Sequence, residues 1–293
     1  MIRLGTRGSA LALVQARWVA ERLEEDAELV PITTLGDRRR DAGDKGRFVG
    51  EIEEALLDGR VDLAVHSAKD VPGRLREGLA IVGVPEREDP LDALCGAASL
   101  DELPSGAVVG TASVRRRSQV SALRPDLEVR PLRGNVDTRL RRLGEGAFDA
   151  IVVARAGLAR LERGAEGVAL PQLVPAPGQG CLALEARAGD ERSAAAAAAL
   201  TDTAALACLT AERALVVGLE ATCNTPVGAH AEVRVGELSL TAYAGLADGS
   251  HWIRDSLAGD AADPAGLGHE VAERMRAAGA GEILAAAEVA LGR

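Results

Sequence analysis

Short apolar runs alternate with stretches that are apolar on one helical face in the N-terminal part of the chain. The apolar runs predict strands at residues 2–5, 29–35 and 61–65, and the periodic stretches predict helices at 10–25 and 48–57. Ser9 stands where its side chain can cap the first of these helices. This strand–helix–strand order predicts an α/β unit built on a parallel sheet.

The same alternation returns after residues 85–90, where two prolines enclose four charged residues. Strands are expected at 107–110, 127–132 and 147–154, and helices from about 114, at 136–143 and at 157–161. A second segment rich in Pro and Gly, 174–180, precedes the apolar run 181–185. Two hinges around one α/β unit indicate that it is inserted into the first unit, whose sheet the strand 181–185 would rejoin. Hinged pairs of this kind close on ligands in the cleft between them.

The C-terminal part of the sequence follows another pattern. Ala-rich helical sequence over 190–219 leads to three alternating runs, 231–235, 237–244 and 252–257, with turn residues between them. Helices over 264–278 and from 282 complete a small α+β domain with a three-stranded antiparallel sheet. The expected organisation is therefore residues 1–86 with 179–200 as the first domain, 90–175 as the second and 201–293 as the third.

Charge and composition narrow the range of partners. The formal net charge is −10, and the only aromatic residues are two Trp, two Phe and one Tyr. Neither a nucleic-acid partner nor an anionic membrane surface is therefore expected. The sequence shows no signal-peptide pattern at its start and no apolar run as long as a membrane span, so a cytoplasmic location is expected.

Sequence motifs exclude several kinds of chemistry. Nucleotide loops of the GxGxxG or GxxxxGK[ST] type are absent, as are HExxH and GxSxG, and the four His and four Cys lack metal-site spacing. Cys95, Cys181 and Cys208 lie in apolar surroundings and are interpreted as structural. Cys223 lies in a polar loop, where a thiol can act as a nucleophile or an attachment point, or can simply pack.

Arginines recur just after predicted strands and at the starts of predicted helices. Arg7 and Arg133 follow strands, and Arg115 comes two residues after Ser113, a second helix-capping position. If the two α/β units face each other, these guanidiniums and the positive helix ends point into one cleft suited to carboxylates or phosphates. The alternative is that Arg is the ordinary surface cation of this chain, which we favour for residues 38–40 and for Arg117.

Four polar side chains follow the strand 61–65 within five residues, in the sequence HSAKD. Because ligands bind at the carboxyl ends of strands in open α/β sheets, Lys69 and Asp70 are candidates for catalysis. A carboxylate beside a lysine can act as a base or can stabilise a cation. The alternative is a solvated loop. For His66 a structural role is the favoured interpretation.

These residues belong to stretches that match one known family in order along nearly the whole chain. The stretches include LGTRGSALAL (4–13), GDKGRFVGEIEEALL (43–57), DLAVHSAKDVP (62–72), VGTASVRR (109–116), LRGNVDTRL (132–140), PAPGQG (175–180) and TAERALVVGLEATCNTPVGAHAEV (210–233). The sequence therefore resembles the porphobilinogen deaminase (hydroxymethylbilane synthase) family.

The resemblance implies a fold, an activity and a cofactor. The fold would be two hinged α/β domains like those of periplasmic binding proteins, with a small α+β third domain. The activity would be that of a transferase of tetrapyrrole (heme and porphyrin) biosynthesis. It condenses four porphobilinogen molecules into hydroxymethylbilane and releases ammonia. A dipyrromethane cofactor would be attached through a thioether to Cys223, and the enzyme would be a cytoplasmic monomer without a metal.

The resemblance also assigns roles to individual residues. Asp70 matches the catalytic residue, which stabilises the cation left when ammonia departs and assists proton transfer. The cofactor contacts would be Lys69, Asp70, Thr111, Ser113, Arg115 and Arg116. The substrate contacts would be Arg7, Ser9, Arg133, Arg139, Arg160 and Gln179. Lys45 and Phe48 would belong to a lid.

Two departures from the family pattern and one rival function accompany these expectations. Ala112 stands where the family often has a hydroxyl residue, and the loop 38–44 looks short, with Asp41 near an often basic position. The rival is an anion receptor with two hinged lobes. The third domain with Cys223 and the missing signal-peptide pattern argue against it.

Overall fold

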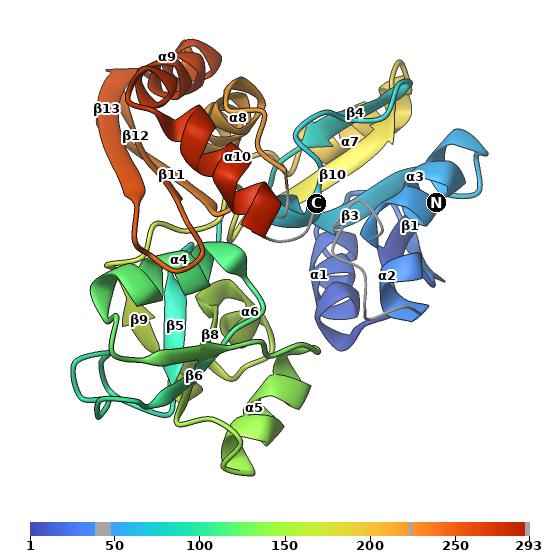
Figure 1. Ribbon diagram of the computed structural model, residues 1–293. Helices are drawn as coiled ribbons and strands as arrows, with labels where there is room; N and C mark the ends of the chain where they lie inside the picture. The colour runs from blue at the N-terminus through green and yellow to red at the C-terminus, as the bar shows by residue number, and fades with distance from the viewer. Residues whose placement is uncertain (39–47, 223–224, 291–293) are drawn as a thin grey trace.

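The computed structural model describes residues 1–38, 48–222 and 225–290, and three sheets organise them (Figure 1). The first sheet has the strand order β2-β1-β3-β10-β4. Its strands are β1 (Ile2–Arg7), β2 (Ala27–Ile32), β3 (Leu63–Ser67), β4 (Leu79–Gly83) and β10 (Leu182–Arg187). We call this sheet the first unit, together with its helices α1 (Ala10–Ala20), α2 (Leu35–Arg38), α3 (Gly50–Leu57) and α7 (Glu191–Ala198).

The pairing of the first sheet agrees with the sequence except at one strand. β1 pairs in parallel with β2 and β3, as predicted, and the strand after the second hinge rejoins this sheet, which confirms that prediction. β10 is antiparallel to both β3 and β4, so the prediction of a parallel sheet is wrong for β10. The reason is its direction of entry: Leu182 at the start of β10 pairs with Ser67 at the end of β3.

Helix α1 begins as predicted and ends earlier. The Ser9 side chain accepts a hydrogen bond from the Ala12 backbone N–H at 3.3 Å. The helix stops at Ala20 rather than at residue 25. Acidic side chains at positions 21, 24, 25 and 26 follow, and negative charge there opposes the negative end of the helix dipole.

The second unit is built on the sheet β7-β6-β8-β5-β9. Its elements are β5 (Asp92–Cys95), β6 (Val108–Gly110), α4 (Val114–Leu123), β7 (Glu128–Arg130), α5 (Val136–Gly144), β8 (Ala150–Ala154), α6 (Arg155–Arg160), η3 (Gly164–Glu166) and β9 (Val168–Leu170). β6 is parallel to β7 and β8, whereas β5 is antiparallel to β8 and β9. The sequence analysis did not predict β5 or β9, because runs of four and three residues are too short to show a period.

The third unit packs helices on a three-stranded antiparallel sheet, β11-β12-β13. Its elements are α8 (Thr203–Gly218), β11 (Val227–Arg234), β12 (Glu237–Gly245), β13 (Trp252–Asp260), α9 (Pro264–Ala277) and α10 (Ala280–Ala290). The predicted helical stretch 190–219 is two helices, α7 and α8, with a bend of 113° between them. Asp202 starts α8 by accepting from the Ala205 N–H at 2.7 Å. The predicted fold class, two α/β units and an α+β unit, is confirmed.

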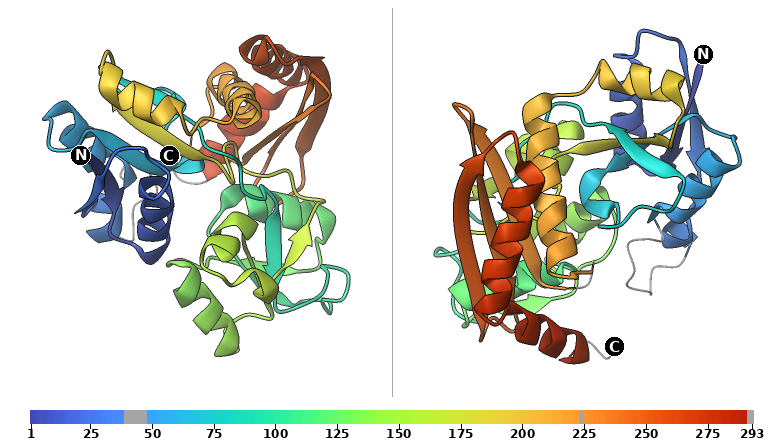
Figure 2. Two further views of the ribbon diagram at one scale, coloured as in Figure 1. Left: turned by 180° about the vertical axis from the view of Figure 1, so that it is seen from behind. Right: turned by 90° about the horizontal axis from the view of Figure 1, so that it is seen from above.

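The three units meet around two hinge segments, residues 85–90 and 174–180. Figure 2 shows from above that α8 lies between the three-stranded sheet and the first unit. The hinge segments lie side by side: the Glu88 N–H donates to the Gly180 carbonyl at 3.3 Å, and Arg87 Nε donates to the Gln179 carbonyl at 2.9 Å. In the described part of the chain no single helix is long and apolar enough to cross a membrane, although the bent pair α7 and α8 passes that test together.

Candidate active site

A short turn at the carboxyl end of β3 carries the candidate catalytic pair. The 3₁₀ turn η2 (Ala68–Asp70) follows Ser67 directly, and the Ala68 N–H donates to the Cys181 carbonyl of the second hinge region at 3.0 Å. Lys69 and Asp70 are partly buried. The strand therefore ends two residues later than predicted and includes His66.

His66 faces the protein interior. Its Nε2 lies 3.2 Å from Glu185 Oε2, and both side chains are buried. The burial of His66 beside Glu185 thus agrees with the structural role favoured from the sequence.

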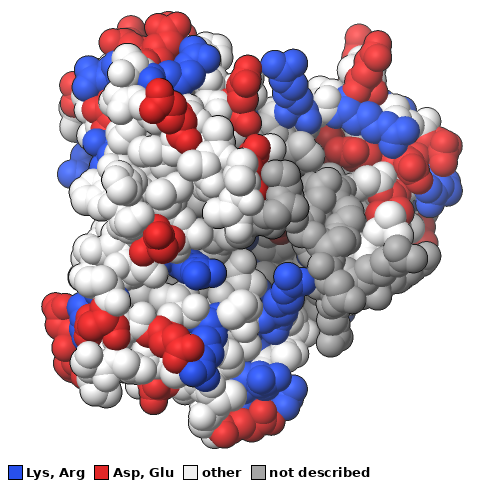
Figure 3. Space-filling view, viewed as in Figure 1, with Lys and Arg blue, Asp and Glu red and all other residues white. Residues whose placement is uncertain are grey.

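A cavity lies between the first and second units beside this turn. It is lined by Ser67 and Lys69 from the first unit, by Gly157 and Arg160 of α6 from the second, and by Gly178 of the hinge. The two units are in close contact here: a Cβ added to Gly157 of the second unit would lie 3.8 Å from the Leu11 side chain of the first unit. Figure 3 shows basic side chains over the second unit beside a hollow in the middle of this face. The cavity is therefore the cleft that the hinge pattern predicted.

Two helices, one in each α/β unit, start at the predicted capping residues. Ser113 caps α4, and its side chain accepts a hydrogen bond from the Arg116 N–H at 3.4 Å. Ser9 caps α1 in the same way. Thr111 Oγ1 accepts from the Ser113 N–H at 3.2 Å, and Ala112 between them is exposed. The positive ends of both helices favour anionic ligands.

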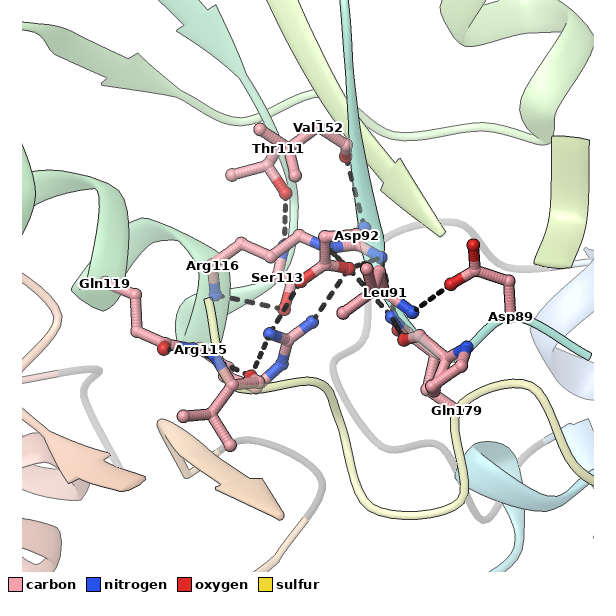
Figure 4. A network of polar contacts seen from close by, with 12 residues as sticks. Asp89, Leu91, Asp92, Thr111, Ser113, Arg115, Arg116, Gln119, Val152 and Gln179 are labelled. Carbon is pink, nitrogen blue, oxygen red and sulfur yellow. Dashed lines mark hydrogen bonds and ion pairs between the residues drawn. The ribbon is translucent and has the colours of Figure 1, made fainter. Parts of the chain in front are cut away.

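Arg115 and Arg116 both bind one buried carboxylate, Asp92, at the start of β5 (Figure 4). Arg115 Nη1 and Arg116 Nη2 each lie 2.8 Å from Asp92, and all three side chains are buried. Burial alone would raise the pKa of Asp92, but the two guanidiniums hold it well below its usual range. Burial lowers the pKa of Arg116. The cluster thus carries two cations for one anion.

Gln179, assigned to the substrate by the resemblance, lies inside this network. It is 1% exposed, and its amide nitrogen donates to the Pro90 carbonyl at 2.7 Å and to Asp92 at 2.9 Å. Its side-chain oxygen accepts from Arg116 Nη2 at 3.4 Å. The structure therefore places Gln179 at the hinge, where it links Asp92 to both hinge segments, and its contact with substrate stays a prediction.

The remaining candidate arginines lie around the cleft in different environments. Arg139, on α5, is partly buried and has a pKa lowered to about 10, mainly by burial and also by the charge of Arg116, whereas the charge of Asp70 acts in the opposite direction. Arg139 and Asp70 therefore interact across the cleft between the units. Burial also lowers the pKa of Arg160, whose Nη2 donates to the Gly180 carbonyl at 2.7 Å. Arg133 is exposed.

The lid and cofactor assignments fall partly outside the described residues. Lys45, Asp41 and Cys223 lie there. Phe48 is described, and its ring centroid lies 4.2 Å from the guanidinium carbon of Arg7. Cys95, Cys181 and Cys208 are buried and free, as expected for structural cysteines, and burial raises the pKa of the Cys95 thiol to about 11.

Two acidic residues of the site region were missed by the sequence analysis. Asp92 binds Arg115 and Arg116 of α4, and Glu212 of α8, which is 0% exposed, binds Arg87 of the first hinge segment at 2.7 Å. Each is a single acidic residue within a mostly apolar stretch, so the hydrophobic pattern did not indicate that it is buried and binds an arginine. In the described residues no group of three or more His, Cys, Asp or Glu could hold a metal ion.

Comparison with known proteins identifies relatives along the whole chain. The family model described as "Porphobilinogen deaminase, dipyromethane cofactor binding domain" matches residues 2–195, and "Porphobilinogen deaminase, C-terminal domain" matches residues 206–277. The porphobilinogen deaminase of Deinococcus radiodurans is 48% identical over 97% of this chain and 98% of the relative. That of Thermus thermophilus is 47% identical over 97% of this chain and 98% of the relative.

Solved structures give a more distant likeness. An ABC transporter protein from Parabacteroides distasonis is 12% identical, with a TM-score of 0.44 over 67% of this chain and 69% of its own. Because two domain models cover most of the sequence and a relative is 48% identical along nearly all of it, the chain belongs to the porphobilinogen deaminase family.

Proposed function

We propose that this chain condenses four porphobilinogen molecules into the linear tetrapyrrole hydroxymethylbilane, with release of ammonia, and that Asp70 is its catalytic residue. The observation that carries the proposal is that Lys69, next to Asp70, and Arg160 line one cleft between the units, while the charge of Asp70 acts on Arg139 of the second unit. Each porphobilinogen bears an acetate and a propionate, and guanidiniums bind carboxylates through paired hydrogen bonds.

The residues of the cleft fit the dipyrromethane cofactor of the family, whose rings also carry carboxylates. Arg115 Nε is buried and has no hydrogen-bond partner among the described residues, so one donor remains for a ligand. The cluster at Asp92 also holds more positive than negative charge. Arg115 and Arg116, with Lys69, Asp70, Thr111 and Ser113, would hold the cofactor, and Cys223 would attach it. When bound, the dipyrromethane supplies the pyrrole end to which new rings are joined.

The remaining arginines would bind the incoming substrate. Arg7, Arg133, Arg139 and Arg160, with Ser9 and Gln179, would take its two carboxylates and orient its ring. Arg139 is well suited because burial makes its charge costly, and a carboxylate ligand relieves that cost.

Asp70 would face the ring nitrogen of the reacting pyrrole. Its carboxylate stabilises the positive charge that develops on the substrate as ammonia leaves, and it holds the proton that moves at that nitrogen. The partly buried position of Asp70 limits water around it, which strengthens this electrostatic effect. We further propose that the protein works as a monomer in the cytoplasm.

One experiment on three proteins tests this function: intact-mass spectrometry followed by turnover assays with porphobilinogen. We expect the wild-type protein to carry the extra mass of a dipyrrole. The Cys223→Ser variant should lack that mass and turn over no substrate. Cys95→Ala is the matched control, because its thiol is buried in the second unit; it should keep the extra mass.

The Asp70→Asn variant should retain the dipyrrole and lose turnover by about 10²-fold or more. Asp62→Asn is its control, because Asp62 precedes the first residue of β3, at the opposite end from Asp70, and is paired with Arg3. A wild-type protein without the extra mass, or an Asp70→Asn variant with full turnover, would contradict the proposal.

A further inference from the structure

Glu212 on α8 is a buried carboxylate that joins the third unit to both hinge segments. It is 0% exposed and lies 2.7 Å from Arg87 Nη1 of the first hinge segment. It also accepts from the Gly178 N–H of the second hinge segment at 2.6 Å and from the Ala231 N–H of β11 at 2.7 Å. One side chain of the third unit therefore fixes both hinge segments.

Gly178 in turn packs against the turn that carries Lys69 and Asp70. A Cβ at Gly178 would lie 3.0 Å from the Ala68 carbonyl carbon and 3.0 Å from the Lys69 nitrogen, and its φ of +73° favours glycine. The same hinge region accepts the Ala68 N–H at the Cys181 carbonyl. The position of the turn is thus set at two points, by Gly178 of the second hinge segment and by Cys181, the residue that follows the segment.

We propose that Glu212 is a positioning residue for Asp70 and acts through the Gly178 N–H. This inference rests on the catalytic role proposed for Asp70. The carboxylate holds Gly178 against Ala68 and Lys69, and Arg87 holds the adjacent Gln179 carbonyl through its Nε at 2.9 Å. Loss of the carboxylate releases the segment and lets the turn shift relative to the cleft.

The contacts of Glu212 predict which kinetic constant it controls. Arg139 donates to the Gly134 carbonyl within the second unit, at 2.9 Å, and does not depend on residues 174–180 for its position. Carboxylate binding by Arg139 should therefore survive a shift of the turn, whereas the alignment of Asp70 should not. Gln179 lies on the released segment and Arg160 donates to the Gly180 carbonyl, so they should add a smaller rise in KM. We expect the fall in kcat to exceed the rise in KM.

The test compares Glu212→Gln with the wild-type holoenzyme. The amide keeps one acceptor oxygen, but its NH₂ group must face one of the N–H donors that the carboxylate now binds. We expect kcat to fall about 10- to 100-fold, with a clearly smaller change in KM. Amide hydrogen exchange over residues 66–72 should be about tenfold faster than in the wild type.

Val271→Ala is the matched control for general destabilisation, because Val271 is buried in the core of the third unit. It should lower thermal stability while leaving kcat and the exchange of residues 66–72 at wild-type values. Wild-type exchange over 66–72 in Glu212→Gln, or equally fast exchange in Val271→Ala, would overturn the positioning role. Hydrogen exchange measures the stability of the turn and not the rate of turnover. It therefore tests the positioning role of Glu212 even if Asp70→Asn keeps its turnover.

Discussion

At the scale of single residues, Asp92 shows how a buried charge organises a binding site. It neutralises one of two buried arginines, and Gln179 ties it to the hinge at 2.9 Å. A carboxylate held ionised by two guanidiniums fixes both in place before any ligand arrives. Such preorganisation lowers the entropic cost of binding a further carboxylate.

Asp92→Asn should be strongly destabilising, because it leaves two buried guanidiniums without their counterion. We expect a loss of about 3–5 kcal/mol in the free energy of unfolding at pH 7, measured with urea. The pKa of Asp92 is held below its usual range. The stability it provides is therefore present above the unfolded-state pKa of about 3.9 and is lost as the pH falls below that value. The stability of the variant should lack this acid-side decline.

Asp126→Asn is the control, because Asp126 pairs with Arg124 at the surface and exposed ion pairs contribute little. Equal losses in the two variants would contradict the buried role of Asp92. Arg115 and Arg116 were predictable from the sequence because they follow a strand and a capping serine. Asp92 was not, because it lies 23 residues from Arg115 and meets it only once β5 has joined the sheet.

At the scale of elements, α3 shows that a helical pattern can predict where a helix lies and still miss a buried acidic side chain on it. Its apolar face, including Ile52 and Leu56, packs on the first sheet as the periodicity predicts. Glu53 lies on that face too and is 7% exposed. The sequence pattern classes every Glu as solvent-facing, so this buried acid was not predicted. Glu185 and His66 from β10 and β3 lie near it and interact with its charge.

Glu53→Gln should make the protein more stable at neutral and alkaline pH. Burial raises the pKa of Glu53, and the nearby Glu185 raises it further. A raised pKa in an acid means that the wild type is most stable below the unfolded-state pKa and loses stability as the pH rises through the folded value. The variant should lose this decline, so its advantage in urea unfolding should grow from pH 4.5 to pH 8. Glu54→Gln, at an exposed position, should show the same dependence of stability on pH as the wild type. If Glu53→Gln also shows the wild-type dependence, the burial of Glu53 does not cause the decline in stability.

At the scale of the whole molecule, the two hinge segments are the centre to which all three units are tied. Two prolines around four charged residues placed one hinge at 85–90, and a cluster of Pro and Gly placed the other at 174–180, from sequence alone. That the segments lie against each other was not predictable, because it depends on contacts such as that between Arg87 and Gln179, which are 92 residues apart. The third unit is bound to the same place through Glu212. Changes at this crossing should therefore alter the relation between the units.

Gly180→Ala tests the crossing directly. Gly180 has a φ of +91°, and an added Cβ would overlap the Glu88 carbonyl oxygen of the other hinge segment. The alanine would therefore hold an unfavourable backbone conformation and would also push the two hinge segments apart.

Gly189→Ala is the matched control, because its φ is +83° and nothing lies within 4 Å of an added Cβ. In urea unfolding the control should lose about 1 kcal/mol from its backbone alone, and Gly180→Ala clearly more. Because the turn of Asp70 packs against the second of these segments at Gly178, Gly180→Ala should also lower kcat, while the control keeps it. Equal losses of stability, with kcat unchanged in both, would show that the crossing does not control the cleft.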